Sequence, residues 1–132
     1  MSGQFIPNAS ATRDDLSWGF LRWFSRPETT QAANLVVIEV AIDPGFGHNF
    51  HKHPDQEEVL YVLDGQVEQW LEEEKRILHP GDAIFIGKGV VHASFNSSSR
   101  PAKFLAILGP CVTQDGYVSV EVGEEAPWKD LR

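Results

Sequence analysis

Residues 45–65 read GFGHNFHKHPDQEEVLYVLDG and hold the features from which both fold and site can be argued. His51 and His53 stand two positions apart, and the apolar run EVLYVL follows at 58–63. Alternate side chains of a β-strand project to the same face, so both imidazoles are expected to enter the same space while Lys52 points away. The stretch therefore predicts two strands, with a pair of histidines near the junction between them.

Glu58 and His92 can complete a set of metal ligands with His51 and His53. Glu58 opens the next predicted strand after the four-residue connection 54–57, and its carboxylate is expected beside the imidazoles if the two strands are antiparallel neighbours. His92 begins a later strand and would close the set in a barrel. Three neutral imidazoles and one carboxylate suit Fe, Mn, Ni or Zn, whereas Ca and Mg prefer oxygen ligands. On an octahedral ion such a set leaves positions open for a substrate, as is typical of a working site.

The rest of the chain is predicted to be almost entirely β. Short apolar runs separated by Gly, Pro, Asp and Asn recur roughly every 8 to 12 residues, the spacing of a sandwich or barrel. A length of 132 residues gives room for one domain, which we place at 1–132, with its N-terminal strands within 17–42. A short helical turn is expected near 14–16 or at 127–132.

Two spacing patterns in this chain resemble the sequence motifs of the cupin family. The first is Gly, five residues, His-x-His, four residues, Glu, six residues, Gly, and it fits 45–65. The second is Gly, five residues, Pro-x-Gly, two residues, His, three residues, Asn, and it fits 81–96 except that Gly87 replaces the usual Pro. Of Glu57 and Glu58, only Glu58 keeps the six-residue interval to Gly65, so the resemblance assigns the ligand role to Glu58. The resemblance implies an all-β fold, a double-stranded β-helix or jelly-roll barrel with the metal inside one end.

The resemblance does not name a reaction, because cupin barrels include dioxygenases, decarboxylases, isomerases, hydrolases, sugar-binding regulators and storage proteins. We expect a metal-dependent enzyme, either an oxidoreductase of the dioxygenase type or an isomerase or decarboxylase, acting on a small polar molecule that chelates the metal. The alternative is a module that holds a small ligand or a metal without turnover, as a carrier or sensor. An enzyme needs a placed acid or base, which distinguishes the two.

Several residues near the motifs are candidates for the remaining roles. His48, Glu57 and Tyr61 are the candidate catalytic acids or bases, with Asp55 also close to the motif. Further candidates for the pocket lie on the predicted strands around the histidines. By alternation Ser94 and Asn96 share a face with His92. Asn96 is a candidate for orienting His92 or a ligand, and Phe50 is a candidate for the pocket wall.

Composition limits the partners of the protein. Eleven Lys and Arg against nineteen Asp and Glu give a net charge of −8, which disfavours nucleic acid and anionic lipid. No apolar run approaches the roughly 18 residues of a membrane span. The single cysteine, Cys111, excludes an intramolecular disulfide and fits a cytoplasmic location.

A homodimer is expected, because the strands EVLYVL and NLVVIEV are apolar on both faces. The aromatic segment Trp18, Phe20, Trp23 and Phe24 is interpreted as core or subunit contact rather than as a surface for stacking a substrate.

Overall fold

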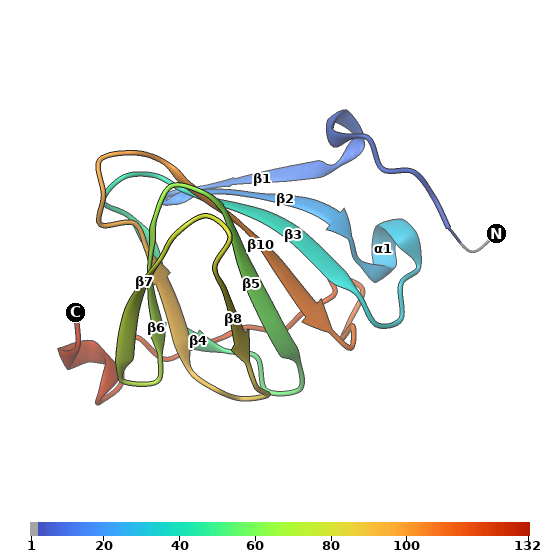
Figure 1. Cartoon of the computed structure of the whole chain (residues 1–132). Helices are drawn as coiled ribbons and strands as arrows, with labels where there is room; N and C mark the ends of the chain where they lie inside the picture. Colours follow the sequence, from blue (N-terminus) through green and yellow to red (C-terminus); the bar gives the residue numbers. More distant parts are fainter. Residues whose placement is uncertain (1–2) are drawn as a thin grey trace.

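Two antiparallel sheets face each other in the computed structural model, which describes residues 3–132 (Figure 1). The first two residues of the predicted 1–132 domain lie outside the described residues. The six-stranded sheet contains, in spatial order, β1 (Thr12–Leu16), β2 (Gly19–Ser25), β3 (Val36–Ile42), β10 (Ala102–Gly109), β5 (Glu57–Asp64) and β8 (Ala83–Ile86). The five-stranded sheet contains β11 (Val120–Glu121), β4 (Gly47–Lys52), β9 (His92–Phe95), β6 (Val67–Leu71) and β7 (Glu74–Leu78).

Helical structure is limited to single turns within the described chain. They are the α-helical turn α1 (Pro27–Thr30) and 3-10 turns at Asn8–Ser10 and Trp128–Asp130. The predicted all-β jelly-roll fold is confirmed, and so is a helical turn near the C-terminus.

Strand β1 corrects the prediction for the N-terminal region. A helical turn was expected near 14–16, and the N-terminal strands were expected only from residue 17 onward. Instead, Thr12–Leu16 forms an edge strand that pairs with β2, and all five of its residues are exposed. Its sequence, TRDDL, has no alternation of apolar and polar residues, so the usual signal for a half-buried strand is missing.

The main core lies between the two sheets and is built by alternate residues of the central strands. β10 alternates buried and half-buried side chains along its whole length, and β3 turns Ile38, Val40 and Ile42 inward. A second cluster, formed by Phe50, Trp70 and Phe95 together with their neighbours, is packed against the C-terminal turn through Trp128. The interior between the sheets is therefore the place where a buried site can be held rigidly.

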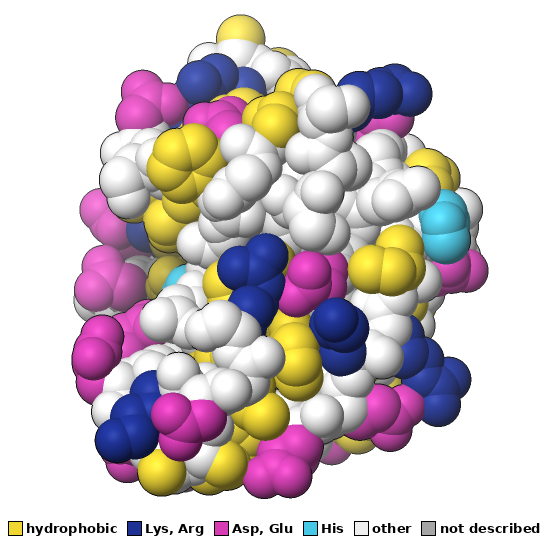
Figure 2. Space-filling view, turned by 90° about the vertical axis from the view of Figure 1, so that its left-hand side faces the viewer, with side chains coloured by type: hydrophobic (Ala, Val, Ile, Leu, Met, Phe, Trp, Pro, Cys, Tyr) yellow, Lys and Arg dark blue, Asp and Glu magenta, His cyan; other side chains and the backbone are white. Residues whose placement is uncertain are grey.

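The outside of the molecule matches the acidic composition. In Figure 2 acidic side chains are spread around the visible face, with basic and apolar side chains between them. Within residues 3–132, no helix has the length and apolar character needed to cross a bilayer.

Candidate metal centre

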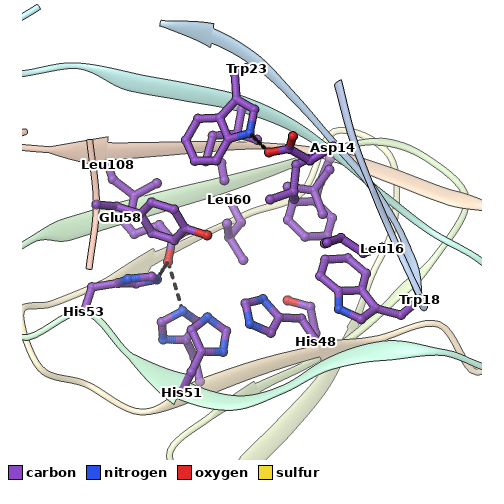
Figure 3. A pocket seen from close by; sticks show the side chains of 18 residues that line it. Asp14, Leu16, Trp18, Trp23, His48, His51, His53, Glu58, Leu60 and Leu108 are labelled. Carbon is purple, nitrogen blue, oxygen red and sulfur yellow. Dashed lines mark hydrogen bonds and ion pairs between the residues drawn. The ribbon is translucent and has the colours of Figure 1, made fainter. Parts of the chain in front are cut away.

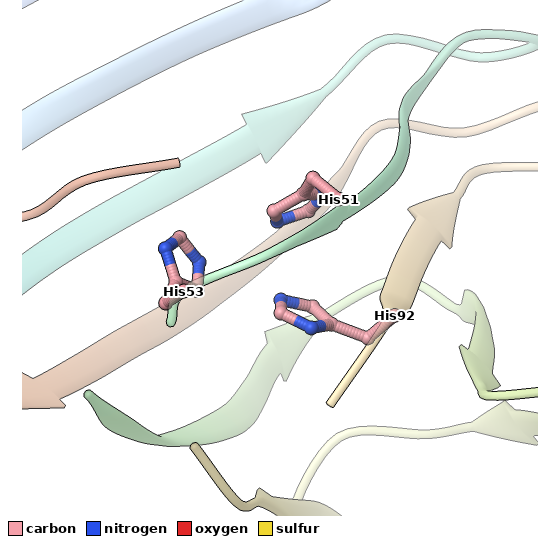
Figure 4. A group of neighbouring side chains, drawn as sticks. All are labelled: His51, His53 and His92. Carbon is pink, nitrogen blue, oxygen red and sulfur yellow. The ribbon is translucent and has the colours of Figure 1, made fainter. Parts of the chain in front are cut away.

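Three histidines converge inside the barrel from adjoining strands of the five-stranded sheet (Figure 4). His51 lies in β4 and pairs directly with His92, the first residue of β9, while His53 follows the end of β4. The ring centroids of His51 and His92 are 4.2 Å apart, and each lies close to 5 Å from that of His53, at 5.1 and 5.2 Å. One ring nitrogen from each residue lies within 4.8 Å of the others, a spacing that allows them to hold one ion.

Glu58 reaches these histidines from the opposite sheet. Its Oε1 lies 2.9 Å from His92 Nε2 and 3.5 Å from His53 Nε2. The condition under which this approach was expected, that the two strands are antiparallel neighbours, is not met, because β5 pairs with β10 and β8. Alternation along β5 buries Glu58 and exposes Glu57, so the carboxylate crosses the interior instead of lying beside the imidazoles on one sheet.

The backbone fixes which nitrogen each histidine turns inward. His51 Nδ1 lies 2.7 Å from the carbonyl oxygen of Asn49, His53 Nδ1 lies 2.9 Å from that of Val118, and His92 Nδ1 lies 3.0 Å from that of Val90. A carbonyl oxygen only accepts hydrogen bonds, so each Nδ1 donates its N–H and leaves Nε2 with a free lone pair. This arrangement orients the ligand atoms of metal-binding histidines.

The electrostatic environment favours the neutral form of two of these rings. Burial lowers the pKa of His51 well below its ordinary value, and the nearby rings of His48, His92 and His53 lower it further. Burial also lowers the pKa of His53, although the charge of Glu58 opposes that effect. Both rings are therefore neutral at pH 7, the state in which an imidazole can ligate a metal.

Two buried atoms of the set have no hydrogen-bond partner within the described chain, namely Glu58 Oε1 and His92 Nε2. With Nδ1 of His92 carrying the proton, both atoms present lone pairs at 2.9 Å, so the contact becomes favourable only when a proton or a metal cation lies between them. A carboxylate oxygen and imidazole nitrogens are ligands for divalent transition metals. The residues present therefore fit such an ion.

An irregularity in β4 adds a fourth histidine to this side of the sheet. His48 pairs with Ser94 and His51 with His92, so three steps along β4 match two along β9, as in a β-bulge. In a regular strand His48 and His51 would face opposite ways, whereas here their rings stack at 3.7 Å. His48 Nε2 also lies 3.3 Å from Glu121 Oε1, and this contact lowers the pKa of Glu121.

A cavity of about 310 Å³ opens above the histidines (Figure 3). Its floor holds the four candidate ligands, with His48 and Ser94 beside them. Its walls are mainly apolar and aromatic, and are formed by Leu16, Trp18, Leu21, Trp23, Ile38, Val40, Leu60, Phe104, Ala106, Leu108 and Tyr117, with Asp14 as the one acidic wall residue. The interpretation of Trp18 and Trp23 as core or subunit contact alone was incomplete, because both line this cavity.

A family model described as the cupin domain matches residues 38–108, more than half of the chain. The chain belongs to the cupin family. Protein SchB of Streptomyces halstedii is 29% identical over 109 residues, which are 81% of this chain and 79% of SchB.

Solved structures show the same fold. The polyketide cyclase RemF of Streptomyces resistomycificus superposes with a TM-score of 0.76 over 98% of each chain, at 18% identity. Oxalate decarboxylase of Bacillus subtilis, described with Mn(II) centres, superposes with a TM-score of 0.73 at 17% identity, covering 89% of this chain and 31% of that one.

Four residues predicted for the site of this cupin lie elsewhere. Glu57 and Tyr61 are exposed, and neither lines the cavity. Phe50 packs edge-on against Trp70 in the second cluster, away from the histidines. Asn96 follows the last residue of β9 and donates hydrogen bonds to the carbonyl oxygens of Ile42 and Arg100, so it ties the end of β3 to the loop after β9 instead of orienting His92.

The motif glycines of this cupin shape its turns. Gly65 has a φ of 73°, and a Cβ there would come within 2.4 Å of the Pro101 carbonyl oxygen. Only glycine fits both the conformation and the space. Gly87, which replaces the usual proline, is not among the residues with positive φ, so its freedom is not used for a left-handed turn.

Sequence reasoning missed one functional candidate, Asp14. It lines the cavity from β1, the strand that could not be recognised from its polar sequence. Once Thr12–Leu16 is known to be a strand, alternation places Asp14 and Leu16 on the same face, and both line the cavity. Asp14 was therefore missed because its strand could not be recognised from the sequence.

Proposed function

We propose that this cupin is a metal-dependent enzyme that holds one divalent transition metal through His51, His53, Glu58 and His92. The observation that carries the proposal is the inward Nε2 atoms, each with its Nδ1 fixed by a backbone carbonyl, facing an unpartnered carboxylate oxygen. Fe, Mn, Ni and Zn all suit this ligand set. The Mn(II) centres named for the similarly folded oxalate decarboxylase support manganese as the first ion to test.

The substrate is proposed to be a small molecule that chelates the metal through neighbouring oxygens. When bound, a divalent ion supplies a Lewis acid that polarises a carbonyl and holds such oxygens in place. The apolar walls exclude water and so strengthen the electrostatic effect of the charged groups on the floor. Ser94, which donates a 2.6 Å hydrogen bond to Gln69, keeps the floor beside the histidines ordered.

His48 is proposed as the acid or base of the reaction. It is the only one of the three candidates His48, Glu57 and Tyr61 that lines the cavity. Stacking on Trp18 at 5.2 Å and the contact with Glu121 hold its ring at the mouth, where it can exchange a proton with a substrate. A side chain positioned to exchange a proton favours isomerase or decarboxylase chemistry. A non-catalytic carrier or sensor would not need such a side chain.

Oxygen dependence separates the proposed reaction classes. An isomerase or decarboxylase turns over under nitrogen, whereas the dioxygenase expected as the other possibility stops when oxygen is removed. Loss of turnover under nitrogen, while the metal stays bound, would favour a dioxygenase over an isomerase or decarboxylase. Metal and ligand binding with no turnover in either atmosphere would favour the carrier or sensor.

Metal analysis tests the site itself. We expect about one equivalent of metal in the purified protein after incubation with MnCl₂ and desalting, and close to none in the His51→Ala/His53→Ala variant. His79→Ala is the matched control, because His79 lies in a turn outside the cavity and its side chain is 58% exposed. Equal metal content in the double variant and the control would refute the proposed centre.

The homodimer is proposed on the outer face of the six-stranded sheet. There Tyr61 pairs with Leu105 and Val59 with Phe85 on adjacent strands, and Tyr61 and Phe85 are 41% and 58% exposed. Phe85→Glu is expected to give the mass of a monomer in analytical ultracentrifugation, and a wild-type monomer at micromolar concentration would count against the dimer. The cytoplasmic location stays a prediction.

A further inference from the structure

The cavity has two ends of different chemistry. One end holds the buried imidazoles and the Glu58 carboxylate, and beyond them the walls are apolar or aromatic. Figure 3 shows Asp14 and Trp23 on the opposite side of the cavity from His51 and His53. A ligand that fills the cavity therefore touches metal-binding groups at one end and a mostly apolar surface along its body.

A small hydrophilic acid matches only the first of these ends. It would reach the ligand atoms of the floor, but would leave the accessible apolar surface of Leu16, Trp18 and Leu21 facing water in the cavity. Removing that apolar surface from water is the main favourable contribution that these walls can make to binding. The walls thus favour a ligand with an apolar body over a diacid of a few atoms.

The aromatic side chains indicate that this body is flat. Trp18 lies at the mouth against His48, and Trp23 and Tyr117 lie 5.4 Å apart, with Tyr117 also 5.5 Å from His53. Aromatic rings stack well on other flat rings, in offset or edge-on arrangements. A cavity of about 310 Å³ is at the lower end of the usual range for ligand pockets, which suits a ring system of about two fused rings.

Asp14 adds a polar group to the apolar end. Its Oδ2 accepts a 2.9 Å hydrogen bond from Trp23 Nε1, which holds the carboxylate at the cavity wall. Within residues 3–132, its Oδ1 accepts no hydrogen bond. A carboxylate oxygen only accepts, so it selects a ligand group that donates, such as a hydroxyl or an amine.

We infer that the ligand is a flat aromatic molecule that presents two neighbouring oxygens to the metal end and a hydroxyl or amino donor to Asp14. This inference rests on the proposed function for its chelating half. Asp14 is then a specificity residue that acts at the end of the ligand remote from the metal.

The test uses the zinc-loaded full-length chain and isothermal titration with defined probes. Naphthalene-2,3-diol chelates and is flat, naphthalene-2,7-diol is flat but cannot chelate, and oxalate chelates without an apolar body. We expect the 2,3-diol to bind at least about tenfold more tightly than either of the others. Oxalate binding as tightly as the 2,3-diol would overturn the inference while leaving the metal site intact.

Asp14 is tested with naphthalene-2,3,6-triol, which adds a donor to the far ring. Asp14→Ala should weaken the triol about tenfold or more and leave the 2,3-diol within about twofold. Asp15→Ala is the matched control, since Asp15 is the next residue of β1 and does not line the cavity. Zinc content is measured for every sample, so a misfolded variant is recognised, and Asp14→Asn, which keeps an acceptor for Trp23, should give an intermediate loss.

The outcomes separate the two proposals. Equal loss of triol affinity in the Asp14 and Asp15 variants, or none in either, would overturn the role of Asp14. A wild-type chain that takes up neither zinc nor manganese would overturn the proposed function and this inference together, and the metal measurement identifies that case.

Discussion

Glu58 Oε1 and His92 Nε2 face each other at 2.9 Å across the barrel interior, one from each sheet, and among residues 3–132 neither has a hydrogen-bond partner. In the absence of a cation this pair costs free energy, because a buried carboxylate oxygen is left beside a lone pair. The pair is therefore expected to lower the stability of the metal-free protein and to contribute ligand atoms when metal is bound.

Glu58→Gln is expected to lower metal affinity at least about tenfold, since it removes the charge of the only carboxylate in the set. The same change should leave the melting temperature of the metal-free protein unchanged or raise it, because it removes an unpaired buried charge. Thermal unfolding with MnCl₂ and with EDTA measures both effects. A variant that melts lower in EDTA and binds metal normally would contradict this account.

Asn96→Ala should reduce stability without changing metal binding. Asn96 is fully buried and donates to the Ile42 and Arg100 carbonyl oxygens, while its own Oδ1 accepts from Ser98. Removing these bonds leaves buried groups unpaired, and we expect a loss of about 2 to 3 kcal/mol in the free energy of unfolding. Urea denaturation measures the loss. A drop in metal content of the folded variant would show that Asn96 acts on His92 after all.

Ile86→Ala should destabilise the barrel by about 2 to 4 kcal/mol, because Ile86 is 1% exposed within the main core. Ile77→Ala is the matched control, since Ile77 is 43% exposed and should cost less than about 1 kcal/mol. Both free energies come from denaturant titration at fixed pH. Similar losses in the two variants would mean that the burial of Ile86 is not what stabilises the sheet.

Glu68 should make the stability depend on pH. Burial raises its pKa, but hydrogen bonds from Arg132 and Trp70 outweigh that effect and hold the pKa below its ordinary value near 4.5. A carboxyl whose pKa is lower in the folded state adds stability above the unfolded pKa, and that stability is lost as pH falls through the folded value. Glu68→Gln should therefore be less stable than wild type at pH 7, by about 1 kcal/mol, and the gap should shrink below pH 4.5. A gap that stays constant down to pH 3 would exclude the charge of Glu68 as its cause.

The spacing of residues was enough to predict which four side chains meet in the cavity, but not the strands from which they approach one another. Alternation correctly placed His51 and His53 on one face, and the interval to Gly65 selected Glu58 over Glu57. Which strands are neighbours depends on long-range pairing, which no local pattern encodes, so the approach of Glu58 from the opposite sheet was missed.

Alternation explains most of the positions around the site, and the bulge in β4 is the exception, because it turns His48 to the same side as His51. Asn96 is buried, but its amide donates to the Ile42 and Arg100 carbonyl oxygens, partners that no local pattern could indicate. Phe50 was misplaced because regular alternation next to His51 turns it to the other face. Tyr61 lies outward by the same rule, one step from the inward Leu60.

The division of the four proposed ligand residues between the two sheets has a mechanical consequence. An ion held by Glu58 from one layer and by three histidines from the other would act as a cross-link between the two layers. Amide hydrogen exchange in β5 and β9 should then slow together when the ion binds, although the two strands share no hydrogen bonds.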